Sequence, residues 1–79
     1  MKLAIIGAGS WGTAISCMLA EKNKEHEIWL WGRDPELAKE INHSRQNAKY
    51  LPNVFLPANV FCSHELTTSI MNADVIVMV

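Results

Sequence analysis

The sequence of 79 residues has little that would indicate a metal site, a disulfide-stabilised fold or a nucleic-acid partner. Its two cysteines, Cys17 and Cys62, have no metal-binding or redox spacing, and isolated thiols are typical of a reducing cytoplasm. Seven basic and eight acidic side chains give a formal net charge of −1, which favours neither nucleic acid nor an anionic membrane. His26, His43 and His64 are scattered, with no carboxylate or cysteine at the spacing of a triad or metal site. We therefore predict three exposed histidines, no catalytic residue and no metal ligand.

The chain also lacks a linker, an internal repeat and any low-complexity segment, although 49% of its residues are hydrophobic. A chain this short buries only about 60% of the surface that it exposes when unfolded. Such a composition fits part of a larger, buried parallel sheet better than a small independent domain.

No charged residue occurs between Leu3 and Ala20, and Lys2 precedes this run. A secretory signal peptide would show a similar pattern. The run contains three glycines at the spacing of a binding loop and a tryptophan, and only one cation flanks it, which argues for a folded segment instead.

What the chain does contain is the segment 7–12, Gly-Ala-Gly-Ser-Trp-Gly, between a short apolar run and a helical pattern. Gly7 permits a tight turn at the strand end, Gly9 lets the backbone approach a pyrophosphate, and Gly12 lets the helix pack close to the strand. A helix that begins at about Ser10 directs unpaired N–H groups and the positive end of its dipole toward the phosphates. The segment therefore predicts a dinucleotide-binding turn.

Strand and helix patterns alternate along the whole chain. Strands are predicted at 2–6, 26–31, 60–62 and 74–79, and helices at 10–22, 35–43 and 65–72. Asp34 is expected to cap the second helix. We predict an α/β fold, a Rossmann-type doubly wound parallel sheet whose first four strands lie in the order 3-2-1-4.

Hydrophobic periodicity predicts which helix faces are buried. The sheet-facing stripe of the first helix is expected at Ala14, Ile15, Met18 and Leu19, and the last helix is expected to gather Leu66, Ile70 and Met71 on one side. Residues 44–59 form a long loop, and loops of this length in a compact domain are usually functional. The fourth strand would leave an unpaired apolar edge, so we expect residues 1–79 to be the N-terminal part of a dinucleotide-binding domain.

The end of the second strand bears on the choice of cofactor. An NAD-binding fold usually has Asp or Glu there, which binds the ribose 2′-hydroxyl. Here the place is taken by Gly32 and Arg33, and a guanidinium suits a 2′-phosphate. NADP is therefore the predicted cofactor, and NAD is the alternative. If Arg33 is only a solvated surface charge, the sequence does not decide between NADP and NAD.

Four segments together resemble bacterial NAD(P)-dependent glycerol-3-phosphate dehydrogenase, and the resemblance covers the whole chain. They are Gly-Ala-Gly-Ser-Trp-Gly-Thr-Ala at 7–14, Trp-Gly-Arg-Asp at 31–34, Asn-Ala-Lys-Tyr-Leu-Pro at 47–52 and Leu-Pro at 56–57. Many dehydrogenases share the glycine segment, whereas the Asn-x-x-Tyr-Leu-Pro segment is far more particular.

The resemblance implies a cytoplasmic oxidoreductase that interconverts sn-glycerol 3-phosphate and dihydroxyacetone phosphate for phospholipid synthesis. It places cofactor contacts at Ser10, Trp11, Arg33 and Tyr50, beside the glycines at 7, 9 and 12. The family's catalytic lysine and helical substrate domain would lie beyond Val79, so we expect residues 1–79 alone to be inactive. The implied partners are the dinucleotide and, once the substrate domain is included, a small phosphorylated substrate. The resemblance implies no insertion into a membrane, and it leaves a homodimer open.

Two alternatives share the glycine segment. One is a reductase of the ketopantoate or 6-phosphogluconate type, which we would not expect to share residues 47–52. The other is a non-catalytic dinucleotide-binding module, because a fold does not determine a function.

Overall fold

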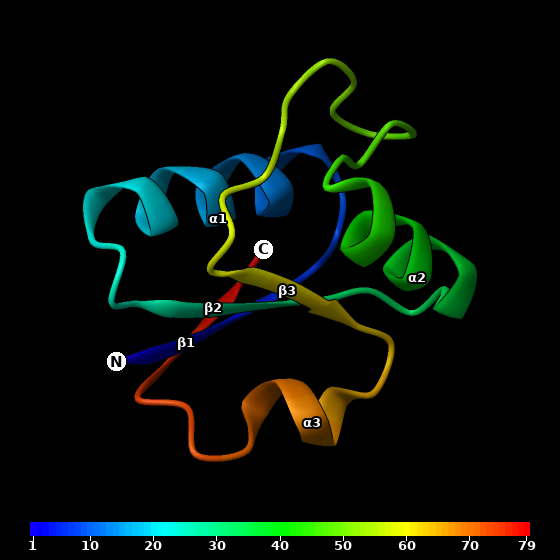
Figure 1. The fold of residues 1–79 in the computed structure, drawn as a ribbon. Coiled ribbons are helices and arrows are strands. Elements are labelled where there is room, and N and C mark those ends of the chain that lie inside the picture. The colour runs from blue at the N-terminus through cyan, green and yellow to red at the C-terminus, as the bar shows by residue number, and fades with distance from the viewer.

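The computed structural model describes all 79 residues as one four-stranded parallel sheet with helices on both faces (Figure 1). The elements, in chain order, are β1 (Lys2–Ile6), α1 (Ser10–Lys22), β2 (Glu27–Trp31), α2 (Pro35–Ser44), β3 (Val60–Ser63), α3 (Leu66–Ile70) and β4 (Val75–Met78). The strand order is β3-β2-β1-β4. The predicted Rossmann-type topology is confirmed, and the element ends differ from the predicted ones by three residues or fewer.

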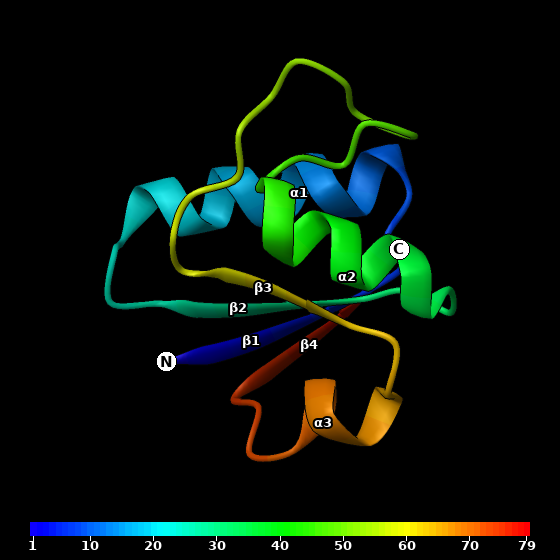
Figure 2. The ribbon, with the colours of Figure 1, turned by 45° about the vertical axis from the view of Figure 1, so that its right-hand side comes forward.

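The helices form two layers around the sheet. α1 and α2 lie over one face, and α3 lies under the other (Figures 1 and 2). The core is centred on β1 and β2, where Ile5, Ile28 and Leu30 are fully buried. None of the three helices combines the length and the apolar character that crossing a membrane requires.

The predicted sheet-facing stripe of α1 is wrong in part. Ala14 and Met18 are exposed, and Ile15 and Leu19 are only half-buried. The buried face consists instead of small residues, namely Gly12, Thr13, Ser16, Cys17 and Ala20.

The reason is the short distance between α1 and the sheet, which leaves room for small side chains only. The hydroxyl groups of Thr13 and Ser16 can lie in this core because they donate to the carbonyl oxygens of Gly9 and Gly12, each at 2.8 Å. Hydrophobicity alone therefore identified Ile15 and Leu19, which pack against the core, and missed the buried small residues.

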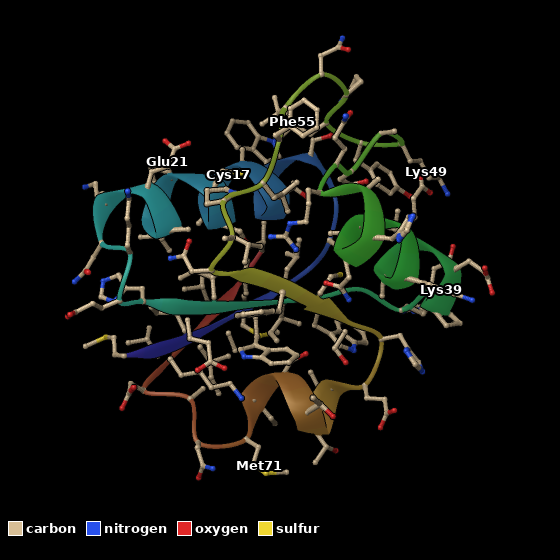
Figure 3. The ribbon with its side chains drawn as sticks, viewed as in Figure 1. Cys17, Glu21, Lys39, Lys49, Phe55 and Met71 are labelled. Carbon is tan, nitrogen blue, oxygen red and sulfur yellow. The ribbon has the colours of Figure 1, made fainter.

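The apolar side predicted for α3 is also wrong. Leu66 and Met71 are exposed, and the fully buried residue of the helix is Ser69. Figure 3 shows Met71 directed away from the sheet, at the outer end of this layer. The five residues of α3 make less than two helical turns, so the helix is too short to gather three apolar side chains on one face.

The long loop after α2 is closed at its base. Arg45 ends α2 in the left-handed conformation, and its guanidinium donates to the carbonyl oxygens of Pro57 and Val60. The backbone N–H of Leu56 donates to the Arg45 carbonyl at 2.7 Å. The segment between these contacts projects above α1 and α2 (Figure 1).

Candidate functional site

A pocket of about 370 Å³ lies at the carboxyl ends of β1 and β2, where Rossmann-type sheets bind their ligands. It is lined by Ala8, Gly9, Gly32, Arg33, Asp34, Leu37 and Tyr50. Three of the predicted cofactor-binding residues, Gly9, Arg33 and Tyr50, are therefore brought together from three segments. The other four, Gly7, Ser10, Trp11 and Gly12, do not line this pocket.

The glycines hold the backbone segments of the site close together. A Cβ atom added at Gly12 would lie 1.7 Å from the carbonyl oxygen of Gly7, so α1 begins in contact with the end of β1. A Cβ atom added at Gly32 would lie 2.7 Å from that of Ala8, which brings the end of β2 against the same turn. Gly7 itself has a φ of +130°, which a residue with a side chain rarely adopts.

Gly9 differs from these glycines because no protein atom lies within 4 Å of the place where its Cβ would be. Its φ of −84° is open to any residue. The protein's own packing therefore gives no reason for glycine at this position, which lines the pocket.

The amide groups at the start of α1 supply hydrogen-bond donors. The N–H groups of Gly9, Ser10, Trp11 and Gly12 have no protein acceptor. No side chain caps this end of the helix, and its first turn has no acidic residue. These free donors and the positive end of the helix dipole favour an anion beside the turn.

Arg33 and Asp34 have separate tasks. The carboxylate of Asp34 accepts a hydrogen bond from the backbone N–H of Glu36 at 2.9 Å, which confirms that Asp34 caps α2. Arg33 is exposed and makes no ion pair or side-chain hydrogen bond within the chain, so its guanidinium is available to a ligand.

The long loop forms one wall of the pocket through Tyr50. The hydroxyl group of Ser10 donates to the carbonyl oxygen of Tyr50 at 2.7 Å, which ties the loop to the start of α1. The ammonium group of Lys49 lies 5.2 Å from the centre of the Tyr50 ring. Figure 3 shows Lys49 on the side of the loop that lies above α2 and Phe55 on the side above α1. Trp11 is 77% exposed, and its contact with a cofactor stays a prediction.

Sequence analysis did not assign a role to the side chain of Asn47, which is fully buried. Its amide nitrogen donates to the carbonyl oxygen of Ala8 at 3.0 Å and to the hydroxyl oxygen of Thr13 at 2.8 Å. Its place in the Asn-x-x-Tyr-Leu-Pro segment was the only sign in the sequence that the residue mattered. Leu37, predicted only as a core residue of α2, also lines the pocket.

No other group of side chains forms a reactive centre. Burial raises the pKa of the Cys62 thiol to about 11, and burial, with Glu21 as a smaller cause, raises that of Cys17. Both thiols are therefore neutral at pH 7 and unsuited as nucleophiles. His26, predicted to be exposed, is half-buried, and its Nδ1 has no hydrogen-bond partner. No three His, Cys, Asp or Glu side chains come together as a metal site would need.

A second hollow of about 420 Å³ lies at the other end of α1, beside Glu21, Lys24 and Asn59. The last-turn carbonyl groups of α1, at the negative end of its dipole, lie at this end. The side-chain amide of Asn59 donates to the carbonyl oxygens of Ala20 and His26, at 3.2 and 2.8 Å. Lys24 is the only cation that lines this hollow, and the Glu21 carboxylate and the negative end of the helix dipole beside it make the hollow less suited to a phosphate than the pocket at the start of α1.

Comparison with known proteins identifies the family. The family described as NAD-dependent glycerol-3-phosphate dehydrogenase N-terminus matches residues 2–79. The chain belongs to this family. The resemblance on which the sequence prediction rested is thereby confirmed.

Relatives of the glycerol-3-phosphate dehydrogenase family match over almost the whole chain. The glycerol-3-phosphate dehydrogenase [NAD(P)+] of Bacillus mycoides is 38% identical over 99% of this chain, and that of Enterococcus faecalis is 40% identical over 99%. In both cases the matched part is 22% of the relative's length. The chain thus spans about a fifth of these curated relatives.

Solved structures of glycerol-3-phosphate dehydrogenases share the fold. The enzyme of Coxiella burnetii superposes with a TM-score of 0.88 and 32% identity, over 98% of this chain and 23% of that one. The enzyme of Saccharomyces cerevisiae superposes with a TM-score of 0.85 and 31% identity, over 100% of this chain and 26% of that one. Residues 1–79 therefore adopt the fold of the N-terminal region of these enzymes.

Proposed function

We propose that residues 1–79 are the N-terminal part of the dinucleotide-binding domain of a glycerol-3-phosphate dehydrogenase. The observation that carries this proposal is the pocket that Gly9, at the start of α1, and Arg33, at the end of β2, line together, with free backbone N–H groups at residues 9–12. A nicotinamide dinucleotide has a pyrophosphate for the amide groups and an adenosine ribose for the region of Arg33. The free backbone donors and the Arg33 guanidinium supply the groups that this half of the cofactor needs.

Each predicted cofactor residue has a place in this arrangement. Gly7 and Gly12 allow the close turn, Gly9 leaves space for the pyrophosphate, and Ser10 and Trp11 contribute backbone donors. Tyr50 lines the adjoining wall together with Arg33. The nicotinamide supplies the hydride chemistry, while these residues bind and orient the cofactor.

NADP is the cofactor that we propose, with NAD as the alternative. No carboxylate is free at the end of β2 to bind a ribose 2′-hydroxyl, because Asp34 caps α2. The unpaired guanidinium of Arg33 instead offers two or more N–H groups to a 2′-phosphate.

Replacing Arg33 by alanine is expected to weaken NADPH binding and to leave NADH binding almost unchanged. A hydrogen bond to a charged group contributes about 1.5–3 kcal/mol, which corresponds to roughly 10- to 150-fold in Kd. The contact is ionic and partly exposed, so added salt should also narrow the preference of the wild type for NADPH. Fluorescence titrations with both nucleotides measure these effects.

Arg33→Lys is the matched variant, because it keeps the charge and loses the planar fork. We expect its affinity for NADPH to lie between those of the wild type and Arg33→Ala. Equal, small losses for NADPH and NADH in Arg33→Ala would mean that Arg33 is a solvated surface charge.

The proposed reaction is the interconversion of sn-glycerol 3-phosphate and dihydroxyacetone phosphate, in the cytoplasm and as a source of phospholipid precursors. The relatives' names support the substrate, and the family match supports the cofactor class. A homodimer is compatible with this proposal.

The isolated residues 1–79 are expected to bind the cofactor without turning over dihydroxyacetone phosphate. Hydride transfer to a carbonyl needs an acid that protonates the oxygen. Of the acids that line the pocket, Asp34 caps α2, and Tyr50 lies with Arg33 on the side that we assign to the adenosine half of the cofactor. Absorbance of NADPH at 340 nm, followed with purified protein and substrate, measures turnover. A steady loss of absorbance would show that a general acid is present among residues described here as structural.

A further inference from the structure

We infer that Asn47 is the positioning residue of the phosphate-binding turn, and that it acts through Ala8 and Thr13. This inference rests on the proposed function, because it concerns the same pocket. It assigns to the loop after α2 a task beyond lining the pocket, namely to set the direction of the amide groups that would bind the pyrophosphate.

Three hydrogen bonds connect Asn47 to the turn in two branches, one directly to Ala8 and one through Thr13 to Gly9. Its amide nitrogen donates to the carbonyl oxygen of Ala8 at 3.0 Å and to the hydroxyl oxygen of Thr13 at 2.8 Å. The Thr13 hydroxyl in turn donates to the carbonyl oxygen of Gly9 at 2.8 Å. The carbonyl groups of Ala8 and Gly9 are therefore both held on the inner side of the turn.

The orientation of the Asn47 amide group follows from these partners. The Ala8 carbonyl can only accept, and the Thr13 hydroxyl uses its hydrogen for Gly9, so both groups need a donor from Asn47. Only the nitrogen of the amide can supply both bonds. An aspartate or a leucine at position 47 could supply neither.

Because the Ala8 and Gly9 carbonyl groups are held, the geometry of the peptide bond determines where the N–H groups of the next residues point. All peptide bonds in the chain are trans, and in a trans peptide the carbonyl of one residue points opposite to the N–H of the next. Holding the Ala8 and Gly9 carbonyls inward therefore turns the N–H groups of Gly9 and Ser10 outward. These two N–H groups have no protein acceptor.

The oxygen atom of the Asn47 side-chain amide supports the inference that Asn47 positions the turn. Its Oδ1 is buried and has no hydrogen-bond partner, which is unfavourable for the stability of the fold. The amide is thus used for its two donors alone. Unsatisfied groups of this kind occur where a local arrangement serves binding.

The backbone of Asn47 extends the connection to Tyr50. Its carbonyl oxygen accepts from the N–H groups of Tyr50 and Leu51, at 3.2 and 2.7 Å, which forms the turn that carries Tyr50. The Tyr50 carbonyl accepts from Ser10 at the start of α1. The closed ring of contacts means that the turn and the pocket wall hold one another in place.

Thr13→Val tests the inference because valine has the shape of threonine and lacks the hydroxyl group. It removes the hydroxyl bond to the Gly9 carbonyl oxygen, which keeps only the backbone N–H of Thr13 at 3.0 Å, and it leaves one Asn47 donor unpaired. We expect the Kd for NADPH to rise about tenfold, as for the partial loss of hydrogen bonds to a charged group. The Kd for 2′-AMP, which has no pyrophosphate and reaches only the Arg33 side, should stay unchanged. Thr13→Ser, which keeps the hydroxyl, should bind NADPH within about twofold of the wild type.

Asn59→Leu is the matched control at the opposite end of α1. Asn59 also donates from its side-chain amide to backbone carbonyl oxygens, those of Ala20 and His26. Its replacement should lower the melting temperature and leave the Kd for NADPH unchanged. Asn47→Leu adds a second variant at the site, with an expected loss of NADPH affinity at least as large as that of Thr13→Val.

The outcomes separate this inference from the proposed function. If the wild type binds no NADPH, the proposed function fails and the inference falls with it. If the wild type binds NADPH and Thr13→Val binds it equally well, the inference alone is overturned. It is overturned as well if Thr13→Val weakens NADPH and 2′-AMP equally, or if Asn59→Leu weakens NADPH as much as Thr13→Val does.

Discussion

Replacing Gly12 by alanine is expected to lower the melting temperature by about 12 °C or more. The new Cβ atom would lie 1.7 Å from the carbonyl oxygen of Gly7 and 2.9 Å from its carbonyl carbon. Both atoms belong to the backbone, so no side-chain rotation can relieve the overlap, and α1 would have to move away from β1. Overpacking typically costs about 1–3 kcal/mol and occasionally more, and a contact this short with rigid backbone belongs at the upper end, about 3 kcal/mol. A loss of 1 kcal/mol shifts the midpoint of a domain this small by about 4–8 °C.

Gly9→Ala is the matched control, because it is the same substitution in the same turn. No protein atom lies within 4 Å of its Cβ position, and its φ of −84° suits alanine. The remaining cost is that of a poorer N-cap residue, about 1 kcal/mol. Thermal unfolding followed by circular dichroism measures both variants. A Gly12→Ala protein that melts within a few degrees of Gly9→Ala would contradict the close contact of α1 with β1.

The second large effect is expected for Gly9→Val, which should weaken the binding of NADPH and leave the fold intact. Gly9→Val should fold, because the space around the Cβ position is open and the extended backbone there suits a β-branched residue. The valine side chain would occupy the part of the pocket in which we place the pyrophosphate. Losing two charge-assisted hydrogen bonds from backbone donors corresponds to at least about 100-fold in Kd.

Calorimetric titration with NADPH measures the effect of Gly9→Val, and the melting temperature of the same sample verifies its fold. Gly9→Ala, with one carbon in place of three, should show a smaller loss of affinity. Unchanged affinity in a folded Gly9→Val protein would exclude the glycine turn as the pyrophosphate site.

The sequence was sufficient to predict the topology because local signals agreed at each element. The signals are the apolar run 3–6, the glycine segment and the Asp-Pro pair at 34–35, each with a direct local cause. The structure places β1, α1 and the cap of α2 accordingly. Parallel strands that alternate with helices then leave few arrangements of the sheet.

The buried face of α1 could not be predicted from hydrophobicity because it depends on the distance between two elements. Gly12 brings the helix so close to β1 that Thr13 and Ser16 fit in the core, whereas Met18 lies outside it. A pattern of apolar residues contains no information about that distance. Thr13 and Ser16 can be buried in the core because their hydroxyl groups donate to carbonyl oxygens in the preceding turn of the helix.

Asn47 was missed as a site residue for a similar reason. It lies 34 residues from Thr13 and 39 from Ala8, so no local pattern connects it with the turn that it contacts. The family resemblance marked its segment as particular without giving a physical reason. The structure supplies that reason, because the loop after α2 folds back onto the start of α1.

The most direct test of the central claim is a crystal structure of the protein with NADPH bound. We predict that the pyrophosphate oxygens lie within about 2.7–3.2 Å of backbone nitrogens at the start of α1. The same structure should place the 2′-phosphate on the guanidinium of Arg33. A dinucleotide bound elsewhere, or a pyrophosphate without contact to residues 9–12, would contradict the account.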